Sequence, residues 1–473
     1  MAPPRRANFE QVFALPPRLE DWLPADHPAR FIRDFVAMLD LPALGFIDKE
    51  VIGPEAPYAM DLMLRVWLYG LFERFRTTRR LEWACYNVIA LRWLTGNQPP
   101  DHVTLWRFFG DHKPALKALF RQSVRVAAQM GLVGMVLHAI DGTKIQAACS
   151  TDTADHRAAL LNALSRLERA VERAFDRMQD DPAPTDSGLR LPATMADAQA
   201  RLDAVRASLA QLDAAQTDHL HPGEPEARMM QGAGKGHAMG YNAQAAVDAD
   251  HYVVVSADVS AEANDTQQLV PMVEQIHQVL GENADQTVVD SGYSTAAQID
   301  AVREQGQARI VVAGLEPSAK ADAFDKSRFR YDPDRDEYVC PRGKSLPLVK
   351  VMEKDPGQAY AVYHCDETRC PERHACTRSP QGRAIARRTF EDAVDAQRAE
   401  QQTPDAQAAL RWRKQLIELV FARAKWIEGL VRFTARGLIN AQTQWAMLCT
   451  TLNLRAMFRA WKSGYPLPAI CPR

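Results

Sequence analysis

Two apolar runs in the middle of the chain each end at an aspartate, and this pattern constrains the fold more than any other feature. Residues 135–140 read Met-Val-Leu-His-Ala-Ile and are followed by Asp141, and Thr-Val-Val at 287–289 is followed by Asp290. Short apolar runs bounded by turn residues are typical of buried strands. We therefore expect two strands that carry their aspartates into one shared site.

The segments around these two runs alternate between strand and helix patterns. Residues 241–248 and 251–258 form a predicted hairpin, residues 266–280 a helix and residues 308–313 a further strand, and a long helical block begins near 405. Strands interleaved with helices favour an α/β fold in which helices flank one mixed sheet. The predicted fold class is therefore α/β.

A third acidic residue, Glu418, lies in the helical stretch 414–421. Its apolar neighbours predict a carboxylate that faces a buried or metal-filled site. Glu428 competes with it but is interpreted as a solvated helix residue. Asp265 competes with Asp290 but precedes a helix and fits an N-cap role better. Three converging carboxylates form a hard-oxygen pocket suited to two Mg²⁺ or Mn²⁺ ions.

Two insertions interrupt the predicted sheet. Apolar residues at heptad-like spacing over 155–181 and 195–213 predict an antiparallel helical hairpin with coiled-coil character, and a Pro- and Asp-bearing linker at 181–188 joins its helices. The second insertion is irregular, charged and cysteine-bearing. The predicted domains are a helical N-terminal domain (1–134), a core (135–313) with the hairpin insertion (151–218), the cysteine-bearing insertion (314–394) and C-terminal core helices (395–473).

The distribution of charge points to nucleic acid, although the net charge does not. The whole chain carries 57 Lys and Arg against 59 Asp and Glu, a net charge of −2. From residue 411 to the end, however, basic residues far outnumber Glu418 and Glu428. A local basic surface neutralises phosphates whatever the average charge of the chain is. In the helical N-terminal part, a basic patch includes Arg79 and Arg80. Two interpretations stay open: short helices with basic ends that enter a DNA groove, or an ordinary helical packing domain with solvated arginines.

Four of the eight cysteines lie close together in the sequence, at Cys340, Cys365, Cys370 and Cys376. Four thiolates can hold a structural zinc ion, but the spacing contains no Cys-x-x-Cys pair. Zinc binding and unliganded thiols therefore both remain open. The other cysteines are expected to pack in cores, and a disulfide framework is not expected in an intracellular chain; these four are Cys85, Cys149, Cys449 and Cys471.

The N-terminus lacks the apolar core of a signal peptide, and no stretch reaches about 18 uninterrupted apolar residues. We therefore expect a soluble protein of the cytoplasm without a membrane partner. Among the aromatic residues, Tyr293 is expected either to stack on a splayed base or to pack beneath the metal loop. Trp412, Trp426 and Trp445 are expected in the core.

Several sequence stretches, taken in order, resemble the RNase H-like DDE transposases of bacterial insertion sequences. Each stretch is weakly specific by itself, whereas the series covers most of the chain. The stretches begin with Pro-Asp-His-Val-Thr-Leu-Trp-Arg-Phe (100–108) and continue with Ile-Asp-Gly-Thr-Lys-Ile-Gln-Ala (140–147), Pro-Glu-Ala-Arg-Met-Met (225–230), Gly-Tyr-Asn-Ala-Gln-Ala-Ala-Val-Asp (240–248), Val-Asp-Ser-Gly-Tyr-Ser (289–294), Arg-Gly-Leu (436–438) and Leu-Asn-Leu-Arg (452–455).

The resemblance implies a role for each matching residue. Asp141 and Asp290 would hold both metal ions, Glu418 would complete the coordination of one, and Lys425 would contact a DNA phosphate near the cut. Three positions depart from the family pattern, because Lys414 replaces an arginine, Arg411 a tyrosine and Ala422 a glycine. The residues implied in DNA binding are Lys425, Lys414, Arg413, Arg436, Arg79, Arg80 and Arg107.

The function implied by the resemblance is transposition. The protein would bind the terminal inverted repeats of its element in double-stranded DNA, cut a strand at each end and join the freed 3′-hydroxyl to target DNA. We expect a homodimer in the DNA complex and association with the nucleoid. Two alternatives stay open: an RNase H-like nuclease without strand transfer, and a catalytically silent DNA-binding protein derived from a transposase.

Overall fold

The computed structural model of the chain describes residues 18–48, 57–180, 193–231, 236–306, 308–314, 323–355, 358–365, 367 and 370–469. The chain forms two compact units. Unit 1 comprises residues 1–133 and 446–473, and unit 2 comprises residues 134–445. The predicted linker at 181–188 and Cys471 lie outside the described residues. No described helix combines the length and apolar character needed to cross a membrane.

Unit 1 is helical, and its core is built from aromatic side chains. Phe31 is fully buried, and its ring lies 5.5 Å from that of Phe458. Asp101 caps one helix, as its sequence position predicts, by accepting a hydrogen bond from the Thr104 backbone. The elements are η1 (Leu19–Trp22), α1 (Pro28–Ala37), α2 (Leu41–Leu44), α3 (Met60–Phe72), α4 (Thr78–Asn87), α5 (Ile89–Leu94), α6 (His102–Asp111) and α7 (Lys113–Gln129).

The last helix, α15 (Leu438–Lys462), belongs to both units. Its residues from 446 onward group with unit 1, where the Arg455 guanidinium lies 4.5 Å from the Phe72 ring centroid. The sequence prediction had assigned all of 395–473 to the catalytic core. The difference arises because apolar residues continue along this helix beyond the part that contacts the sheet: Leu454 and Met457 are fully buried in unit 1.

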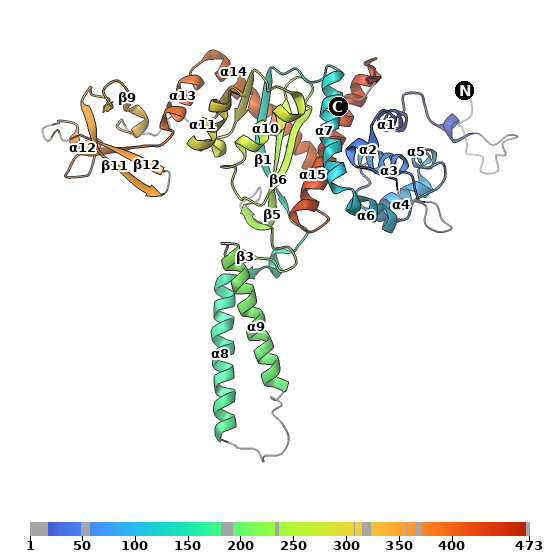
Figure 1. The fold of residues 1–473 in the computed structure, drawn as a ribbon, viewed down its shortest axis with the longest axis horizontal. Coiled ribbons are helices and arrows are strands. Elements are labelled where there is room, and N and C mark those ends of the chain that lie inside the picture. The colour runs from blue at the N-terminus through green and yellow to red at the C-terminus, as the bar shows by residue number, and fades with distance from the viewer. Residues whose placement is uncertain are drawn as a thin grey trace, which may run out of the picture. The chain divides into compact units, whose positions relative to one another are not determined.

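Unit 2 is built around one mixed sheet flanked by helices, as the sequence predicted (Figure 1). The strand order is β4-β5-β1-β7-β8, with β6 paired to the same edge of β5 as β4. β1 pairs antiparallel with β5 and parallel with β7, and β7 pairs parallel with β8. The strands are β1 (Leu137–Gln146), β4 (Arg228–Gln231), β5 (His237–Asp248), β6 (Val254–Ser260), β7 (Gln286–Val289) and β8 (Ile310–Val312).

The register of the sheet brings the two aspartates to neighbouring strands. Asp141 lies within β1, two residues beyond Ala139, which is paired with Val288 of β7. Asp290 follows the last residue of β7 and begins the short η3 turn (Ser291–Tyr293). Because β1 and β7 run parallel, both carboxylates reach the same end of the sheet. The expectation of two strand-borne aspartates at one site is therefore met by the topology.

Helices cover the sheet and fix the surroundings of this strand end. α14 (Pro404–Ala422) packs against β1, β5 and β7, and α10 (Leu269–Leu280) packs against β5 and β6. α11 (Ala296–Gln305) follows the η3 turn, and α13 (Glu391–Gln401) precedes α14. α14 ends in a single π-helical turn, η5 (Arg423–Ile427). These π-turns are frequent at functional sites.

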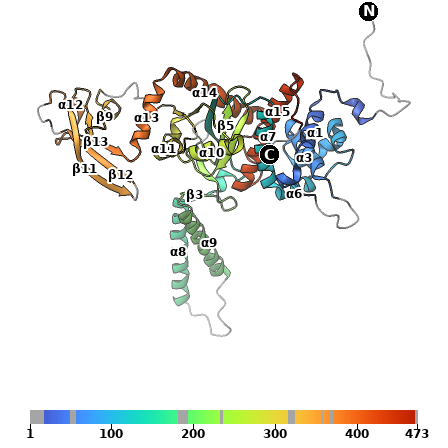
Figure 2. The ribbon, with the colours of Figure 1, turned by 45° about the horizontal axis from the view of Figure 1, so that its top comes forward.

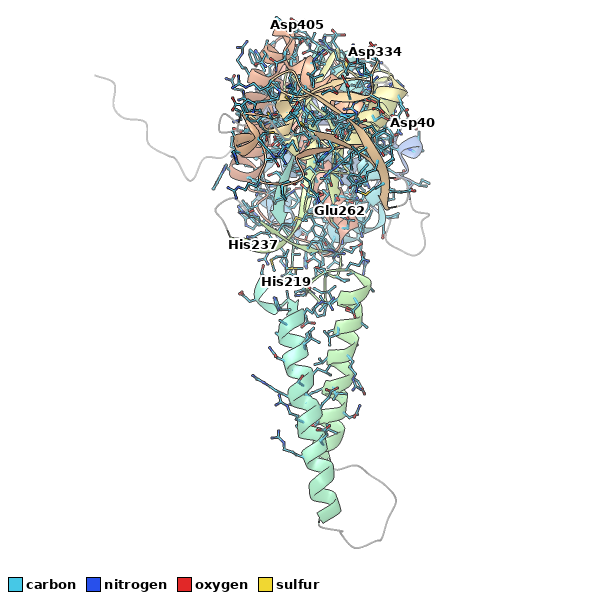
Figure 3. All side chains as sticks on the ribbon, turned by 90° about the vertical axis from the view of Figure 1, so that its left-hand side faces the viewer. Asp40, His219, His237, Glu262, Asp334 and Asp405 are labelled. Carbon is cyan, nitrogen blue, oxygen red and sulfur yellow. The ribbon has the colours of Figure 1, made fainter. Side chains whose placement is uncertain are left out.

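The first insertion is a helical hairpin. α8 (Arg157–Asp180) and α9 (Ala193–Ala214) lie side by side in the views of Figures 1 and 3. Short strands β2 (Asp155–His156) and β3 (His219–Leu220) pair at its base, near the short turn η2 (Thr151–Thr153), and Figure 3 shows His219 at this end. Two helices with apolar faces at helical spacing bury those faces against each other, as the heptad-like pattern predicts.

The prediction that the second insertion is irregular is wrong, because it forms its own five-stranded antiparallel sheet, seen from a second direction in Figure 2. Its core is a cluster of aromatic residues in which Tyr338 and Tyr363 are buried, and the Arg387 guanidinium lies 3.7 Å from the Tyr331 ring centroid. The elements are η4 (Lys326–Arg328), β9 (Arg330–Asp332), β10 (Glu337–Val339), β11 (Ser345–Asp355), β12 (Gln358–Cys365), α12 (Arg373–Cys376) and β13 (Arg383–Arg388).

A buried glutamate fastens the start of α15 to the sheet. Glu224 is 1% exposed, and its carboxylate accepts hydrogen bonds from the Tyr241 hydroxyl at 3.0 Å and from the backbone N–H groups of Cys149 at 2.9 Å and Gly437 at 3.1 Å. A buried carboxylate is stable when such donors replace its water shell. The three bonds join parts of the chain that are far apart in sequence.

Candidate active site

Arg413 on α14 brings the charges of Asp141 and Asp290 together. Its Nη1 lies 3.2 Å from Asp141 Oδ2, and its Nη2 lies 3.8 Å from Asp290 Oδ1. The Arg413 side chain is 8% exposed, whereas Asp141 and Asp290 are 21% and 47% exposed. One buried guanidinium thus lies within ion-pair distance of both carboxylates and offsets one of their two negative charges. The sequence named Arg413 as a phosphate contact, and its ion pairs to the aspartates were not anticipated.

Asp141 has an unusual protonation equilibrium. Burial raises the pKa of its carboxyl to about 6, and the carboxylates of Asp290 and Asp265 act in the same direction. The Gly142 backbone N–H, which donates to Asp141 Oδ1 at 2.8 Å, and the charge of Arg413 oppose this rise. Strongly perturbed carboxyl groups cluster at functional sites.

Asp265 is a third acid of this site. Its Oδ1 accepts hydrogen bonds from Asn242 Nδ2 at 2.7 Å and Gln244 Nε2 at 2.6 Å, both from fully buried residues on β5. A Cβ atom on Gly142 would lie 2.5 Å from Asp265 Oδ1, so the carboxylate rests directly against the backbone next to Asp141. Lys144 Nζ approaches the same oxygen at 3.6 Å.

The N-cap role predicted for Asp265 is wrong. α10 begins at Leu269, and its N-cap is Gln268, which makes no side-chain cap hydrogen bond. Two amides on β5 hold Asp265 instead. The signal in the sequence was the pair of amide residues at alternate positions of an otherwise apolar strand, because buried amides need polar partners.

Tyr293 packs beneath the loop that follows Asp290. It is fully buried, and its hydroxyl donates a hydrogen bond to Gln244 Oε1. Burial, followed by the charges of Asp265, Asp141 and Asp290, raises the pKa of this phenol well above its ordinary value. The packing alternative is therefore the one that the structure adopts, and the buried ring cannot stack on a base.

Two lysines lie beside the acids. Burial lowers the pKa of Lys144, against the pull of Asp265 and Asp141. Burial and the charge of Lys144 lower the pKa of Lys425. Both side chains line a cavity of about 330 Å³ that also includes His237, Met239 and Trp426. A pair of half-buried cations without equal countercharge is suited to hold a phosphate.

The two glutamates of the C-terminal block differ from prediction. Glu418 lies on α14 but is exposed and makes no hydrogen bond or ion pair with any described residue, so the expected buried carboxylate is wrong. Glu428, expected to be solvated, is 2% exposed. The reason is geometric: Leu416 and Ile417 turn toward the sheet, and the next position along the helix points away from it.

The tryptophan predictions hold for one residue of three. Trp445 is fully buried, and its indole N–H donates to the Gln244 carbonyl at 2.8 Å. Trp412 and Trp426 are 53% and 82% exposed, so their assignment to the core is wrong. Helical spacing shows that apolar residues share one face of a helix. It does not show whether that face lies in the core or on the surface.

The other basic residues named for DNA binding lie on the surface. In unit 1, Arg79, Arg80 and Arg107 are exposed on α4 and α6, two helices that pack together. The exposed aromatic residues Trp83 and Trp106 accompany them at 57% and 48% exposure. In unit 2, exposed basic side chains occur at Lys414 and Arg436.

Three of the four cysteines of the second insertion pack against its aromatic core. Cys340, Cys365 and Cys376 contact the buried aromatic cluster, and burial raises the pKa of the Cys376 thiol. Cys340 Sγ accepts hydrogen bonds from the backbone N–H groups of Arg342 and Lys344, both at 3.3 Å. These cysteines do not form a metal-binding cluster within the described part of the chain. Cys85, Cys149 and Cys449 are buried in cores, as expected.

The donor set of the main site suits a hard divalent cation. The Arg413 guanidinium already occupies a position between the carboxylates of Asp141 and Asp290, so the space between them accepts positive charge. Carboxylate oxygens are the ligands preferred by Mg²⁺ and Mn²⁺. Across the described ranges, however, no three His, Cys, Asp or Glu side chains are grouped closely enough to hold an ion by themselves. A divalent ion held between Asp141 and Asp290 would need further oxygen donors.

The six-stranded mixed sheet has β1 between an antiparallel β5 and a parallel β7, with Asp141 within β1 and Asp290 directly after β7. This arrangement is consistent with an RNase H-like DDE domain. Two family models match the chain. The model described as transposase DDE domain matches residues 339–458, and the model described as transposase domain (DUF772) matches residues 17–111. These two matches, to separate parts of the chain, support a DDE transposase of an insertion sequence, a class for which the family implies nucleotidyl transfer on DNA.

The matched ranges include α4, α6 and α14 but not the strands that carry Asp141 and Asp290. No curated protein matches the chain. No solved structure matches it either.

Proposed function

We propose that this transposase binds the terminal inverted repeats of its own element, cuts a DNA strand at each end and joins the freed 3′-hydroxyl to target DNA. The observation that carries the proposal is the bridging of Asp141 and Asp290 by one guanidinium at the end of an RNase H-like sheet. Phosphoryl transfer depends on positioning and charge neutralisation more than on covalent help. Paired acids with neighbouring cations provide both.

Asp141 and Asp290 are proposed to hold two Mg²⁺ or Mn²⁺ ions, with Glu418 as the third protein ligand. Such ions activate an attacking hydroxyl and stabilise the leaving oxygen when they are bound. Support for Glu418 comes from its place on the helix that carries Arg413 and from its carboxylate, which is exposed and has no described partner. Asp265 is proposed as a positioning residue, because it holds Lys144 beside Asp141.

The cations around the acids are proposed to orient the DNA. Lys425 and Lys144 share the cavity next to the acids, so a phosphate there would relieve the repulsion between them. Arg413, Lys414 and Arg436 are proposed as further phosphate contacts. In unit 1, the exposed arginines of α4 and α6 are proposed to bind the inverted repeat. A structural zinc ion at the second-insertion cysteines and assembly as a homodimer remain predictions.

A strand-transfer assay tests the proposed function. The substrate is a pre-cleaved element end with a free 3′-hydroxyl, supplied with a second duplex and Mg²⁺ or Mn²⁺. We expect joined product from the natural protein and none from Asp290→Asn. The exposed aspartate Asp334 supplies the matched control, because Asp334→Asn removes a charge on the second insertion and should leave joining unchanged.

The same assay separates the alternatives. Cleavage without joining would favour an RNase H-like nuclease. Binding of element ends that is unaffected by Asp290→Asn, together with the absence of both cleavage and joining, would favour a silent DNA-binding protein. Glu418→Gln tests the third ligand against Glu304→Gln, which changes an exposed glutamate on α11. Equal activity of these two variants would remove Glu418 from the site.

A further inference from the structure

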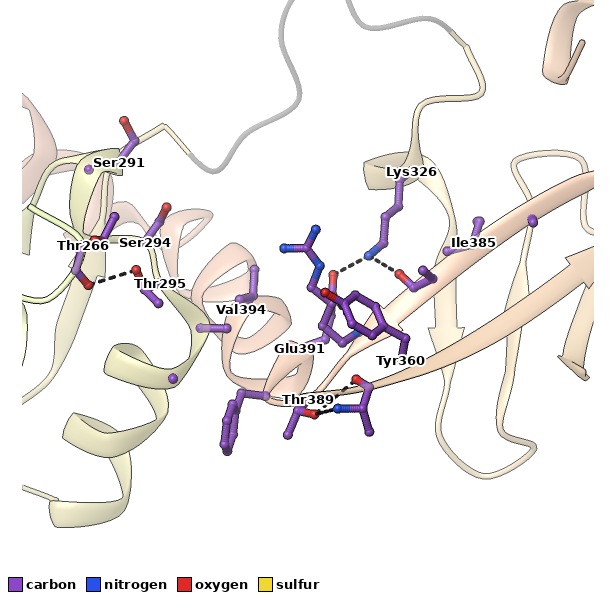
Figure 4. A pocket seen from close by; sticks show the side chains of 18 of the residues that line it. Thr266, Ser291, Ser294, Thr295, Lys326, Tyr360, Ile385, Thr389, Glu391 and Val394 are labelled. Carbon is purple, nitrogen blue, oxygen red and sulfur yellow. Dashed lines mark hydrogen bonds and ion pairs between the residues drawn. The ribbon is translucent and has the colours of Figure 1, made fainter. Parts of the chain in front are cut away.

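A large open cavity lies between the loop after Asp290 and the second insertion. Its volume is about 880 Å³. One wall consists of Thr266, residues 291–292 and residues 294–297, and the other consists of residues from η4, β12, β13 and the start of α13 (Figure 4). Sites of roughly 300–1,000 Å³ accommodate ligands of nucleotide size. The cavity is therefore large enough for part of a DNA strand.

The cavity begins immediately beside the acids. Asp290 Oδ1 accepts hydrogen bonds from the backbone N–H of Ser291 at 2.6 Å and from its hydroxyl at 3.3 Å. Ser291 itself lines the cavity, as does Thr266, the residue after Asp265. If a phosphate of a DNA strand lies at Asp290, the next nucleotide of that DNA strand therefore enters this cavity.

The charges on the insertion wall leave an excess of positive charge. Lys326 Nζ lies 2.7 Å from Glu391 Oε1, so the one acid that lines the cavity is already neutralised (Figure 4). Arg388 is exposed. The Arg383 Nη2 donates a hydrogen bond to the Phe324 carbonyl at 3.2 Å, and the Arg383 Nε has no hydrogen-bond partner in the described part of the chain. The Arg383 guanidinium also lies 5.6 Å from the Phe329 ring centroid and interacts with the charge of Asp325, so the exposed Arg388 carries the excess positive charge on this wall.

An aromatic ring lies beside one of these cations. The Arg388 guanidinium is 5.7 Å from the Tyr360 ring centroid, and both residues occupy paired positions of β12 and β13. The opposite wall offers the hydroxyls of Ser294 and Thr295, although Thr295 already donates to the Thr266 carbonyl at 3.0 Å. Cations that bind phosphates next to an aromatic ring that stacks on bases form the usual surface for single-stranded nucleic acid.

We propose that this cavity binds the DNA strand adjacent to the scissile phosphate, with Arg388 and Arg383 on its phosphates and Tyr360 against a base. The proposal rests on the proposed function, because it assumes that a DNA strand is cut at Asp290. It also gives the second insertion a direct part in holding the substrate. In this arrangement the strand runs from the cavity lined by Lys144 and Lys425, past the acids, to the cavity lined by Arg388.

Binding of an element-end duplex with a short unpaired tail at the cut tests the proposal. We expect Arg388→Ala to weaken binding about tenfold and to reduce the salt dependence by about one phosphate contact, whereas Arg388→Lys retains that slope. Arg303→Ala is the matched control, because Arg303 is exposed on α11 and does not line the cavity. Tyr360→Ala should also weaken binding about tenfold, and Tyr360→Phe should not.

The outcomes distinguish this proposal from the proposed function. If the natural protein cuts and joins element ends while Arg388→Ala and Tyr360→Ala bind the tailed duplex as tightly as Arg303→Ala, the cavity does not hold the strand. If the natural protein neither cuts nor joins, the proposed function fails first. Circular dichroism and the Tyr360→Phe variant show whether a loss of binding arises from unfolding of the insertion.

Discussion

Replacing Asp141 by Asn should stabilise the protein in the absence of divalent ions. Burial raises the pKa of Asp141 from 3.8 to about 6 in the folded protein. Its charged form is therefore disfavoured by folding, and the folded state holds the proton more tightly than the unfolded state does. The stability of the natural protein consequently decreases as the pH rises from about 4 to about 6, and above that range the full cost is present.

The size of this effect follows from the pKa difference. At about 1.4 kcal/mol for each pH unit, a change from 3.8 to about 6 costs about 3 kcal/mol at neutral or alkaline pH. At about pH 5 the cost is roughly half as large, because the carboxyl is mostly protonated in the folded state. The Asp141 side chain is 21% exposed, so solvent screens this cost only weakly. Asn keeps the shape of the side chain without its charge.

Urea unfolding in EDTA, followed by tryptophan fluorescence, measures the difference. We expect Asp141→Asn to raise the free energy of unfolding by about 3 kcal/mol near pH 8 and by about half of that near pH 5. Asp290→Asn is the control, because nearly half of that side chain is exposed and its replacement should change stability by less than about 0.5 kcal/mol. Equal stability of Asp141→Asn and the natural protein at both pH values would refute the reasoning.

Adding Mg²⁺ or Mn²⁺ extends the same experiment to the metal site. An ion that binds the folded state alone stabilises it by mass action. The natural protein should therefore become more stable with increasing ion concentration, whereas Asp141→Asn should not respond. An equal response of both proteins would place ion binding elsewhere. This measurement is independent of DNA cleavage.

Three other substitutions examine separate parts of the molecule. Gly142→Ala places a Cβ 2.5 Å from Asp265 Oδ1 and should lower the free energy of unfolding by about 1–3 kcal/mol, measured by thermal unfolding. Gly110→Ala is the control, because its Cβ meets no atom within 4 Å and should not destabilise the protein. Glu224→Gln removes an acceptor from its three buried hydrogen bonds and should cost about 1–3 kcal/mol in urea unfolding; an unchanged midpoint would contradict this. Arg107→Ala should reduce the salt slope of inverted-repeat binding by about one, and an unchanged slope would exclude this phosphate contact.

Much of the fold could be predicted from local patterns in the sequence. The run before Asp141, the Thr-Val-Val run before Asp290 and the hairpin around 249–250 each have the period or composition of strands, and the structure contains strands at all three places. The heptad-like hairpin and the helical N-terminal part follow in the same way. Periodicity reports which side of an element is apolar, and that property depends on neighbouring residues in sequence.

The candidate site could be predicted in part. Asp141 and Asp290 each follow an apolar run, and the parallel pairing of β1 with β7 brings these two positions to neighbouring strands. The roles of Asp265 and Arg413 could not be predicted, because each depends on a contact between residues more than twenty positions apart. Asn242 and Gln244 donate hydrogen bonds to Asp265, and Arg413 contacts Asp141, which lies 272 positions away in the sequence.

The sequence by itself determined the main strands of the core, the helical hairpin, the two aspartates that follow apolar runs and the resemblance to a transposase family. Tertiary structure alone decided which charges meet and which side chains are buried. Glu418 and Glu428 illustrate the difference, because both lie among apolar neighbours, yet Glu418 is exposed and Glu428 is 2% exposed. Local apolar content does not fix the rotation of a helix against a sheet, whereas the packing of α14 on β1, β5 and β7 does.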